Sequence, residues 1–231
     1  MKKFSIILLL VACLSIFAGN AFGVRAGTQV DQHISAANGN NHWTVAGSPY
    51  YLQGDIFVLP NETLTIDAGV VVASYVYEDG SLVVCRDAQI FVNGTQQNPV
   101  IMTSAEDVAT WGGSVYTRDA GTASTFYPDG YVDEISVMGN PKTGVWRARS
   151  NEWGNLTVLG NAHIASTYNA TASGNVAYPD ADNTDVMEGL QADPGNGITA
   201  DMIRYGGGDD DDSSGSITYL SLRYGGREIA L

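Results

Sequence analysis

Cysteine is almost absent from this chain. The two cysteines are Cys13 and Cys85, and Cys13 falls within an N-terminal targeting segment. Cys85 then has no partner for an internal disulfide, so stacked apolar strands and backbone hydrogen bonds must hold the fold together. Cys85 also replaces Leu59 and Leu159 of a repeat described below. We therefore expect a small buried hydrophobe that thiol reagents do not reach.

Basic residues are also scarce. Lysine and arginine together number 11 against 25 aspartates and glutamates, which gives a formal net charge of −14. A surface of this sign repels nucleic acid and anionic membranes, so neither is an expected partner. It attracts divalent cations, although aspartate also serves in turns, where its side chain caps the local backbone.

Long apolar runs are missing except near the N-terminus. Residues 4–17 are apolar, but the run is shorter than the ~20 residues that a membrane-spanning helix needs. Preceding lysines and small residues near position 23 predict a signal peptide at 1–23. Leu10 to Cys13 also match a bacterial lipobox, which leaves a lipid anchor at Cys13 as the alternative. Residues 24–41 are polar and predict a flexible lead-in to a domain at 42–231.

A repeated strand pattern dominates the rest of the chain. The pattern of residues 54–66 returns 26 residues later at 80–92, and a third copy occupies 156–164. Short apolar strands at fixed spacing bury their faces only by stacking on one another. The repeat therefore predicts an all-β fold, a right-handed parallel β-helix (solenoid). Val58 should lie over Val84 and Ile66 over Val92. No window shows the 3.6-residue apolar period of an α-helix.

Two stretches break the repeat, and we expect them to be loop insertions on one face of the solenoid. They are residues 105–151 and 166–190, and such insertions often form the binding face. The first is rich in aromatic residues, whose flat rings suit sugar faces. Its candidate glycan-binding residues are Trp111, Tyr127, Tyr131 and Trp146. Trp153, just beyond it, either joins this surface or covers the core.

A second repeat lies near the C-terminus. Residues 198–207 return at 217–226, which places Arg204 and Arg223 at equal positions. If the copies stack, the two arginines form a ladder, either packed over tyrosine rings or binding an anionic glycan. The chain stops within a strand pattern at Leu231, and we expect the solenoid to continue in a longer protein.

Four consecutive aspartates, Asp209 to Asp212, lie between these copies. Calcium takes six to eight oxygen ligands, and the candidate ligands here are Asp209, Asp211 and Asp212. The spacing matches neither the EF-hand loop nor the nonapeptide calcium repeat. A solvated, mobile loop is therefore the alternative. No other cofactor is expected.

Several segments resemble a family of large secreted bacterial proteins. The similar stretches are residues 50–58, 64–69, 153–162, 188–193 and the final Arg-Tyr-Gly-Gly. Members of this family are largely uncharacterised right-handed parallel β-helices, often labelled lipoproteins. The resemblance implies a β-helix at the outer face of a bacterial cell. It supplies no catalytic residues.

The choice between an enzyme and a binding protein rests on which side chains the strands carry. We find no Gly-x-Ser-x-Gly elbow, P-loop or dinucleotide fingerprint. The strand acids Asp67, Asp87 and Asp201 form no recognisable catalytic pair, and Lys142 is the one lysine outside the signal segment. We therefore expect a non-catalytic secreted or cell-surface protein that binds an extracellular glycan. The alternative is a polysaccharide lyase or hydrolase on the same scaffold.

Overall fold

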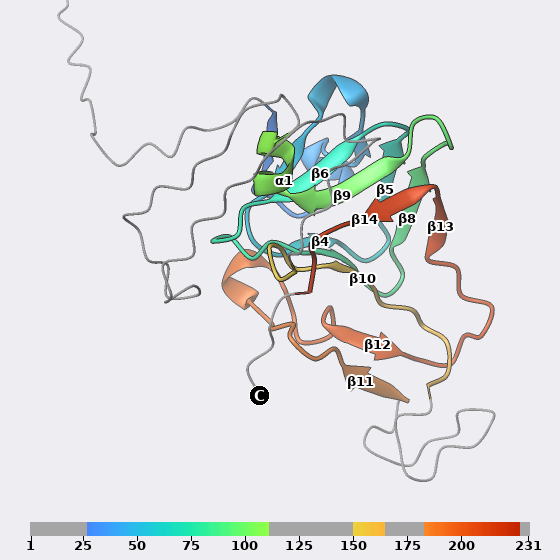
Figure 1. Ribbon diagram of the computed structural model, residues 1–231. Coiled ribbons are helices and arrows are strands. Elements are labelled where there is room, and N and C mark those ends of the chain that lie inside the picture. The colour runs from blue at the N-terminus through green and yellow to red at the C-terminus, as the bar shows by residue number, and fades with distance from the viewer. Residues whose placement is uncertain (1–26, 111–149, 165–182, 227–231) are drawn as a thin grey trace, which may run out of the picture.

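The computed structural model describes residues 27–110, 150–164 and 183–226 (Figure 1). Within these ranges the chain winds through three parallel sheets. Sheet A contains β1 (Thr28–Val30), β3 (Tyr50–Leu52), β6 (Val71–Ser74), β9 (Val100–Ser104) and β14 (Leu220–Leu222). Sheet B contains β4 (Ile56–Val58), β7 (Leu82–Val84) and β10 (Leu156–Val158). Sheet C contains β2 (His42–Trp43), β5 (Thr63–Asp67), β8 (Gln89–Asn93) and β13 (Gly215–Thr218).

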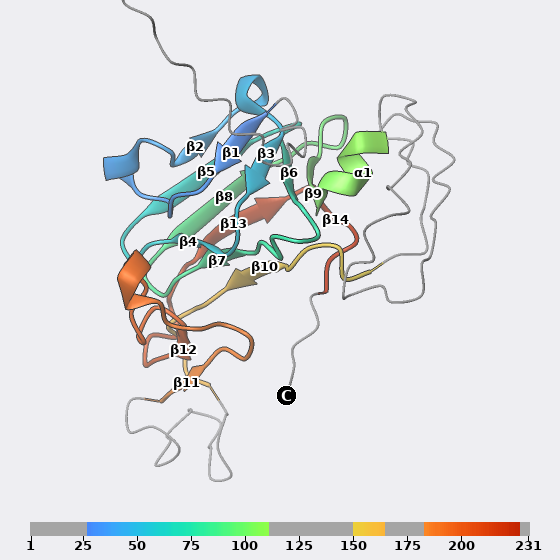
Figure 2. The same ribbon diagram turned by 90° about the vertical axis from the view of Figure 1, so that its left-hand side faces the viewer.

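Successive coils visit the three sheets in the same order. One coil runs β3, β4 and β5, and the next runs β6, β7 and β8. Every pairing between these coils is parallel. Val58 pairs with Val84 and Ile66 pairs with Val92, so the predicted register is confirmed. The fold is a parallel β-helix (Figure 2).

Sheet C shows the burial pattern of a sheet with one solvated face. Its inward positions are fully or almost fully buried, and its outward positions are partly exposed or exposed. A strand alternates its side chains between two faces, so this pattern places sheet C between the core and solvent. Sheet A strands β3, β6 and β9 and sheet B strands β4 and β7 are buried at every position. Other parts of the chain must therefore cover their outer faces.

A short helix, α1 (Ala105–Thr110), covers part of sheet A. Ala105 forms a small buried cluster with Tyr51 and Ala73 of that sheet, and Figure 1 shows α1 beside β6 and β9. The expectation of no α-helix is wrong here. The helix follows β9 without a break and spans less than two turns, so it is too short to display a helical period.

Residues 183–206 cover the outer side of sheet B. This segment contains β11 (Thr184–Val186), the 3-10 turn η3 (Pro194–Asn196) and β12 (Arg204–Gly206). Ile198 and Ile203 are buried and belong to the same cluster as the strand residues of sheet B. Burial of such side chains stabilises by about 25 cal/mol per Å², so this segment is an integral part of the fold.

Arg86 fixes that segment to the coil that contains β7. Its Nη1 donates to the carbonyl of Gly206 at 3.0 Å, and its Nη2 pairs with the carboxylate of Asp201. The side chain of Arg86 is only 15% exposed. A largely desolvated guanidinium bound at two points makes a stronger link than a surface ion pair.

The expected flexible lead-in at 24–41 is wrong for its described part. Residues 27–41 contain β1 and the 3-10 turn η1 (Ala36–Asn38). β1 pairs in parallel with β3, and Ile34 is fully buried and bridges Val58. Only two apolar residues interrupt this polar stretch, too few to show a periodic pattern. The predicted signal peptide lies outside the described residues.

The C-terminal copies do not stack on one another. β12 pairs antiparallel with β11, whereas β14 pairs in parallel with β9. Arg204 Nε donates to Thr184 Oγ1 at 3.0 Å, and Arg223 Nε donates to Ser221 Oγ at 3.1 Å. The expected arginine ladder is therefore wrong, because similar local sequences have different long-range partners.

In the described ranges, no helix is long and apolar enough to cross a membrane.

Candidate functional site

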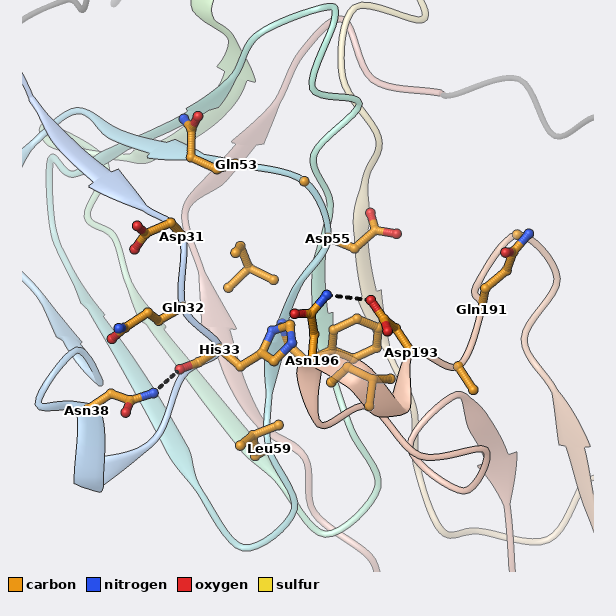
Figure 3. Close-up of a pocket in the computed structure, with 16 residues that line it drawn as sticks. Asp31, Gln32, His33, Asn38, Gln53, Asp55, Leu59, Gln191, Asp193 and Asn196 are labelled. Atoms are coloured by element: carbon orange, nitrogen blue, oxygen red, sulfur yellow. Dashed lines mark hydrogen bonds between the residues drawn. The ribbon is translucent and has the colours of Figure 1, made fainter.

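A groove of about 880 Å³ lies between one edge of sheet B and the segment that covers this sheet. Its first wall comes from the corners that lead from sheet A to sheet B. Its second wall comes from residues 189–198, which include η3. Figure 3 shows the two walls facing each other across the groove. The lining residues are Asp31, Gln32, His33, Asn38, Gln53, Gly54, Asp55, Ile56, Phe57, Leu59, Gly189, Gln191, Ala192, Asp193, Asn196 and Ile198.

The first wall is polar because two successive corners lie side by side. Residues 31–33 connect β1 to Ile34, and residues 53–55 connect β3 to β4. Corner residues do not face the core, so they can be polar without a burial cost. Gln53 holds the two corners together, since its backbone N–H donates to the carbonyl of Val30 at 2.9 Å.

His33 lies at the base of this wall against Phe57. The two rings meet edge to face with centroids 5.3 Å apart. His33 Nδ1 accepts the backbone N–H of Phe57 at 3.3 Å, and its carbonyl accepts from Asn38 Nδ2 at 2.8 Å. Burial lowers the pKa of His33, and the backbone of Asn196 and the nearby carboxylates oppose this shift only in part. The ring is therefore neutral at pH 7.

The second wall is a tight turn. The carbonyl of Asp193 accepts the N–H groups of Asn196 and Ile198 at 3.0 and 2.9 Å. Asn196 Nδ2 donates to Asp193 Oδ2 at 2.5 Å. Gly197 ends the turn with φ of 86°, a conformation that glycine adopts at little cost. These contacts present one carboxylate and one amide toward the groove.

The groove combines two kinds of chemistry. Its polar groups are three carboxylates, one imidazole and five side-chain amides. Its accessible apolar surface comes mainly from Leu59 and Ala192, because Ile56, Phe57 and Ile198 are at most 3% exposed. Carboxylates accept hydrogen bonds, and amides both donate and accept. A groove lined mainly by such groups can form many hydrogen bonds to a polar ligand.

The aromatic residues predicted to bind glycan lie outside the described residues. They are Trp111, Tyr127, Tyr131 and Trp146. Trp153 is described and is 2% exposed, and its Nε1 donates to the carbonyl of Arg223 at 2.5 Å. The interpretation of Trp153 as a core-covering residue is therefore correct, and the ring has no free face for a sugar.

The acidic loop at 209–212 is hydrogen-bonded to residues 161–163, which follow β10. Asp212 Oδ2 accepts the N–H of Asn161 at 3.0 Å, and Asp209 Oδ1 accepts the N–H of Asp211 at 3.1 Å. Asp210 accepts from the backbone and ring of His163, which lowers the pKa of this carboxyl. The part of the chain that the structure describes contains no group of three or more His, Cys, Asp or Glu side chains that could hold a metal. Calcium at Asp209, Asp211 and Asp212 stays a prediction.

Cys85 lies in the core at the position that the repeat predicts. It is fully buried, and Leu159 at the same position of the next coil is 1% exposed. Burial raises the pKa of the Cys85 thiol to about 12, and the charge of Asp201 adds to this effect. A thiol with so little thiolate is a poor nucleophile and a poor metal ligand.

The sequence did not point to the groove. His33 is one of three histidines that lie far apart in the sequence, and Asp31, Asp55 and Asp193 belong to no motif. One signal was present, because Asp31 and Asp55 each follow a short strand at the same corner of successive coils. The signal can be recognised only if residues 27–41 are already taken as one turn of the β-helix.

Comparison with known proteins supports the fold. A family model described as a pectate-lyase like beta helix domain matches residues 38–130, which is less than half of the chain. No curated protein and no solved structure matches the chain. The match covers the part of the first wall that comes from residues 53–59, whereas residues 31–33 and the whole second wall at 189–198 lie outside it.

Proposed function

We propose that this protein is a secreted or cell-surface binding protein without catalytic activity, and that its ligand is an extracellular glycan held in the groove. The pectate-lyase-like match supports a β-helix scaffold of the kind used by both surface proteins and carbohydrate-active enzymes. Such domains are typically extracellular, and the predicted signal peptide at 1–23 agrees with export.

The observation that carries the proposal is the composition of the groove. Its volume of about 880 Å³ falls within the ~300–1,000 Å³ of ligand sites in proteins. Five side-chain amides line it, from Gln32, Asn38, Gln53, Gln191 and Asn196 (Figure 3). Amides satisfy hydroxyls as donors and as acceptors, which suits the hydroxyl-rich edge of a sugar.

The lining of the groove fits a protein that only binds a glycan better than it fits a lyase, which cleaves uronate-containing chains by elimination. A lyase needs a basic group to remove a proton and positive charge to stabilise the carbanion. No lysine or arginine lines the groove among the described residues. The alternative function, a hydrolase, is favoured by the three carboxylates, because glycoside hydrolysis uses two. New reducing ends, formed when the protein is incubated with a panel of polysaccharides, would establish hydrolase activity.

Native gel electrophoresis in polysaccharide-containing gels tests the binding function. A strongly acidic chain migrates quickly, and a bound immobile polymer retards it. We expect retardation by at least one polysaccharide of the panel. The double variant Gln32→Ala/Gln191→Ala should reduce it, because both side chains are exposed and line the groove. Gln96→Ala, an exposed glutamine in a turn away from the groove, is the matched control.

Two outcomes separate the groove from other surfaces. Loss of retardation in the double variant, with the control and the melting temperature unchanged, supports glycan binding in the groove. Retardation that survives in the double variant but falls in Tyr127→Ala or Tyr131→Ala would move the site to the aromatic insertion. We keep Trp111, Tyr127, Tyr131 and Trp146 as a proposed second contact surface.

Export and anchoring have a separate test. Intact-mass measurement of the mature protein distinguishes cleavage near residue 23 from lipidation at Cys13. We propose cleavage, because the small residues that suit a signal peptidase follow the apolar run.

A further inference from the structure

The groove carries an unusual balance of charge for a site on a pectate-lyase-like scaffold. Its described lining residues include the carboxylates of Asp31, Asp55 and Asp193 and no cationic side chain. The nearest ionisable base is His33, and burial keeps its ring neutral at pH 7. The groove therefore presents negative potential to any ligand that enters it.

The first wall adds to this potential from two directions. Asp31 lies on the corner after β1, and Asp55 lies on the equivalent corner of the next coil. Asp193 lies on the opposite wall (Figure 3). The one arginine that links the covering segment to sheet B, Arg86, is already bound to Asp201 and to the Gly206 carbonyl. It is not among the residues that line the groove.

We propose that the groove selects uncharged glycans and discriminates against polyuronates, an inference that rests on the proposed glycan-binding function. The five amides donate to and accept from hydroxyls, which neutral and acidic sugars share. The carboxylates distinguish the two classes, because a uronate brings a like charge into the groove. Bidentate recognition of a carboxylate is typically the task of arginine, and the lining has none.

The expected discrimination follows from Coulomb's law. For a ligand carboxylate taken to lie ~7 Å from each of the three aspartates, in the dielectric of water, the affinity falls by about tenfold at 0.01 M salt. At 0.15 M salt the Debye length is ~8 Å, and the same geometry gives about three- to fourfold. The preference for uncharged glycans should therefore weaken as salt rises, whereas binding of a neutral glycan should change little.

A chemically matched pair of ligands tests this proposal. Hexagalacturonate and its fully methyl-esterified form share one backbone and differ in charge. Calorimetric titration of the whole protein with each, in parallel with neutral polysaccharides and polyuronates on native gels, gives the ratio of affinities at low and at physiological salt. Asp31→Lys should raise the relative affinity for polyuronates by about fivefold at low salt, because one charge changes sign. Asp67→Lys, on the solvated face of sheet C and outside the groove, is the matched control.

The outcomes divide cleanly. Tighter binding of neutral than of uronate ligands, with a gap that narrows in salt and in Asp31→Lys, supports the inference. Equal or tighter binding of polyuronates by the unmodified protein overturns the inference and leaves glycan binding intact. Failure of every neutral and acidic glycan to bind overturns both the inference and the proposed function.

Discussion

The reactivity of Cys85 gives a direct measure of how tightly the coils stack. In a chain with Cys13→Ser, Cys85 is the only thiol. Its side chain is fully buried, and Leu159 of the next coil covers the same position. A thiol reagent can reach it only when coils separate, so labelling reports opening of the β-helix.

The magnitude follows from two separate barriers. The pKa of Cys85 rises from 9.0 to about 12, which lowers the thiolate fraction at pH 8 by about a thousandfold. In an opened molecule the thiol regains its ordinary pKa, and the rate of labelling is then limited by the fraction of opened molecules. A domain with ~5 kcal/mol of stability opens fully in fewer than one molecule in a thousand. We expect labelling at least about a thousandfold slower than in the unfolded chain.

The assay is the reaction with a chromogenic disulfide reagent at pH 8, with and without urea. Urea should restore the full rate at the concentration that unfolds the protein, as followed by circular dichroism. Cys85→Ser provides the blank. Labelling of the folded protein within tenfold of the unfolded rate would refute the placement of Cys85 in the stacked core.

Further predictions concern the core, the groove histidine and the acidic loop. Leu82→Ala, at a fully buried position of the central strand of sheet B, should lower the free energy of unfolding by about 2–5 kcal/mol. Leu156→Ala, at a half-buried position of the edge strand, should cost clearly less; equal losses in urea titrations would contradict the stacking order. Because burial lowers the pKa of His33, the unfolded chain binds more protons as pH falls below 6.5. The stability contributed by neutral His33 is then present above pH 6.5 and lost below it. His33→Gln should flatten urea midpoints measured from pH 7.5 to 5, and an unaltered slope would count against this origin. If the 209–212 loop binds calcium, a hundredfold excess over Kd should add about 2.7 kcal/mol; identical melting temperatures in chelator and in millimolar calcium would exclude it.

The sequence predicted the strands of sheets B and C because stacked positions must carry similar side chains. Residues that are related by the 26-residue period, such as Ile56 and Leu82, face the same interior and pair directly. The period therefore encodes the long-range contacts of these two sheets. This explains why the register is confirmed at Val58 and Ile66.

The groove could not be predicted in the same way, because its walls are not periodic. One wall consists of corners, where the chain tolerates many polar residues. The other wall, 189–198, reaches sheet B through the buried Ile198 and Ile203 and through Arg86. Arg86 and Asp201 are 115 residues apart in the sequence, and nothing local indicates that they meet.

The two C-terminal copies show that similar local sequences can pair with different strands. Residues 198–207 and 217–226 resemble each other, yet one forms an antiparallel pair with β11 and the other adds to sheet A. Ser214 and Thr218 of the connecting chain lie against β8, which brings the second copy back to the coil axis. Strand pairing depends on such distant partners as well as on local sequence.

A crystal structure of the protein with a bound neutral oligosaccharide tests the central claim most directly. The ligand should be the one that retards the protein most strongly in the polysaccharide panel. We predict sugar density in the groove, within hydrogen-bond distance of Gln53, Gln191 or Asn196. Ordered sugar on the solvated face of sheet C, with the groove empty at saturating ligand, would contradict the account.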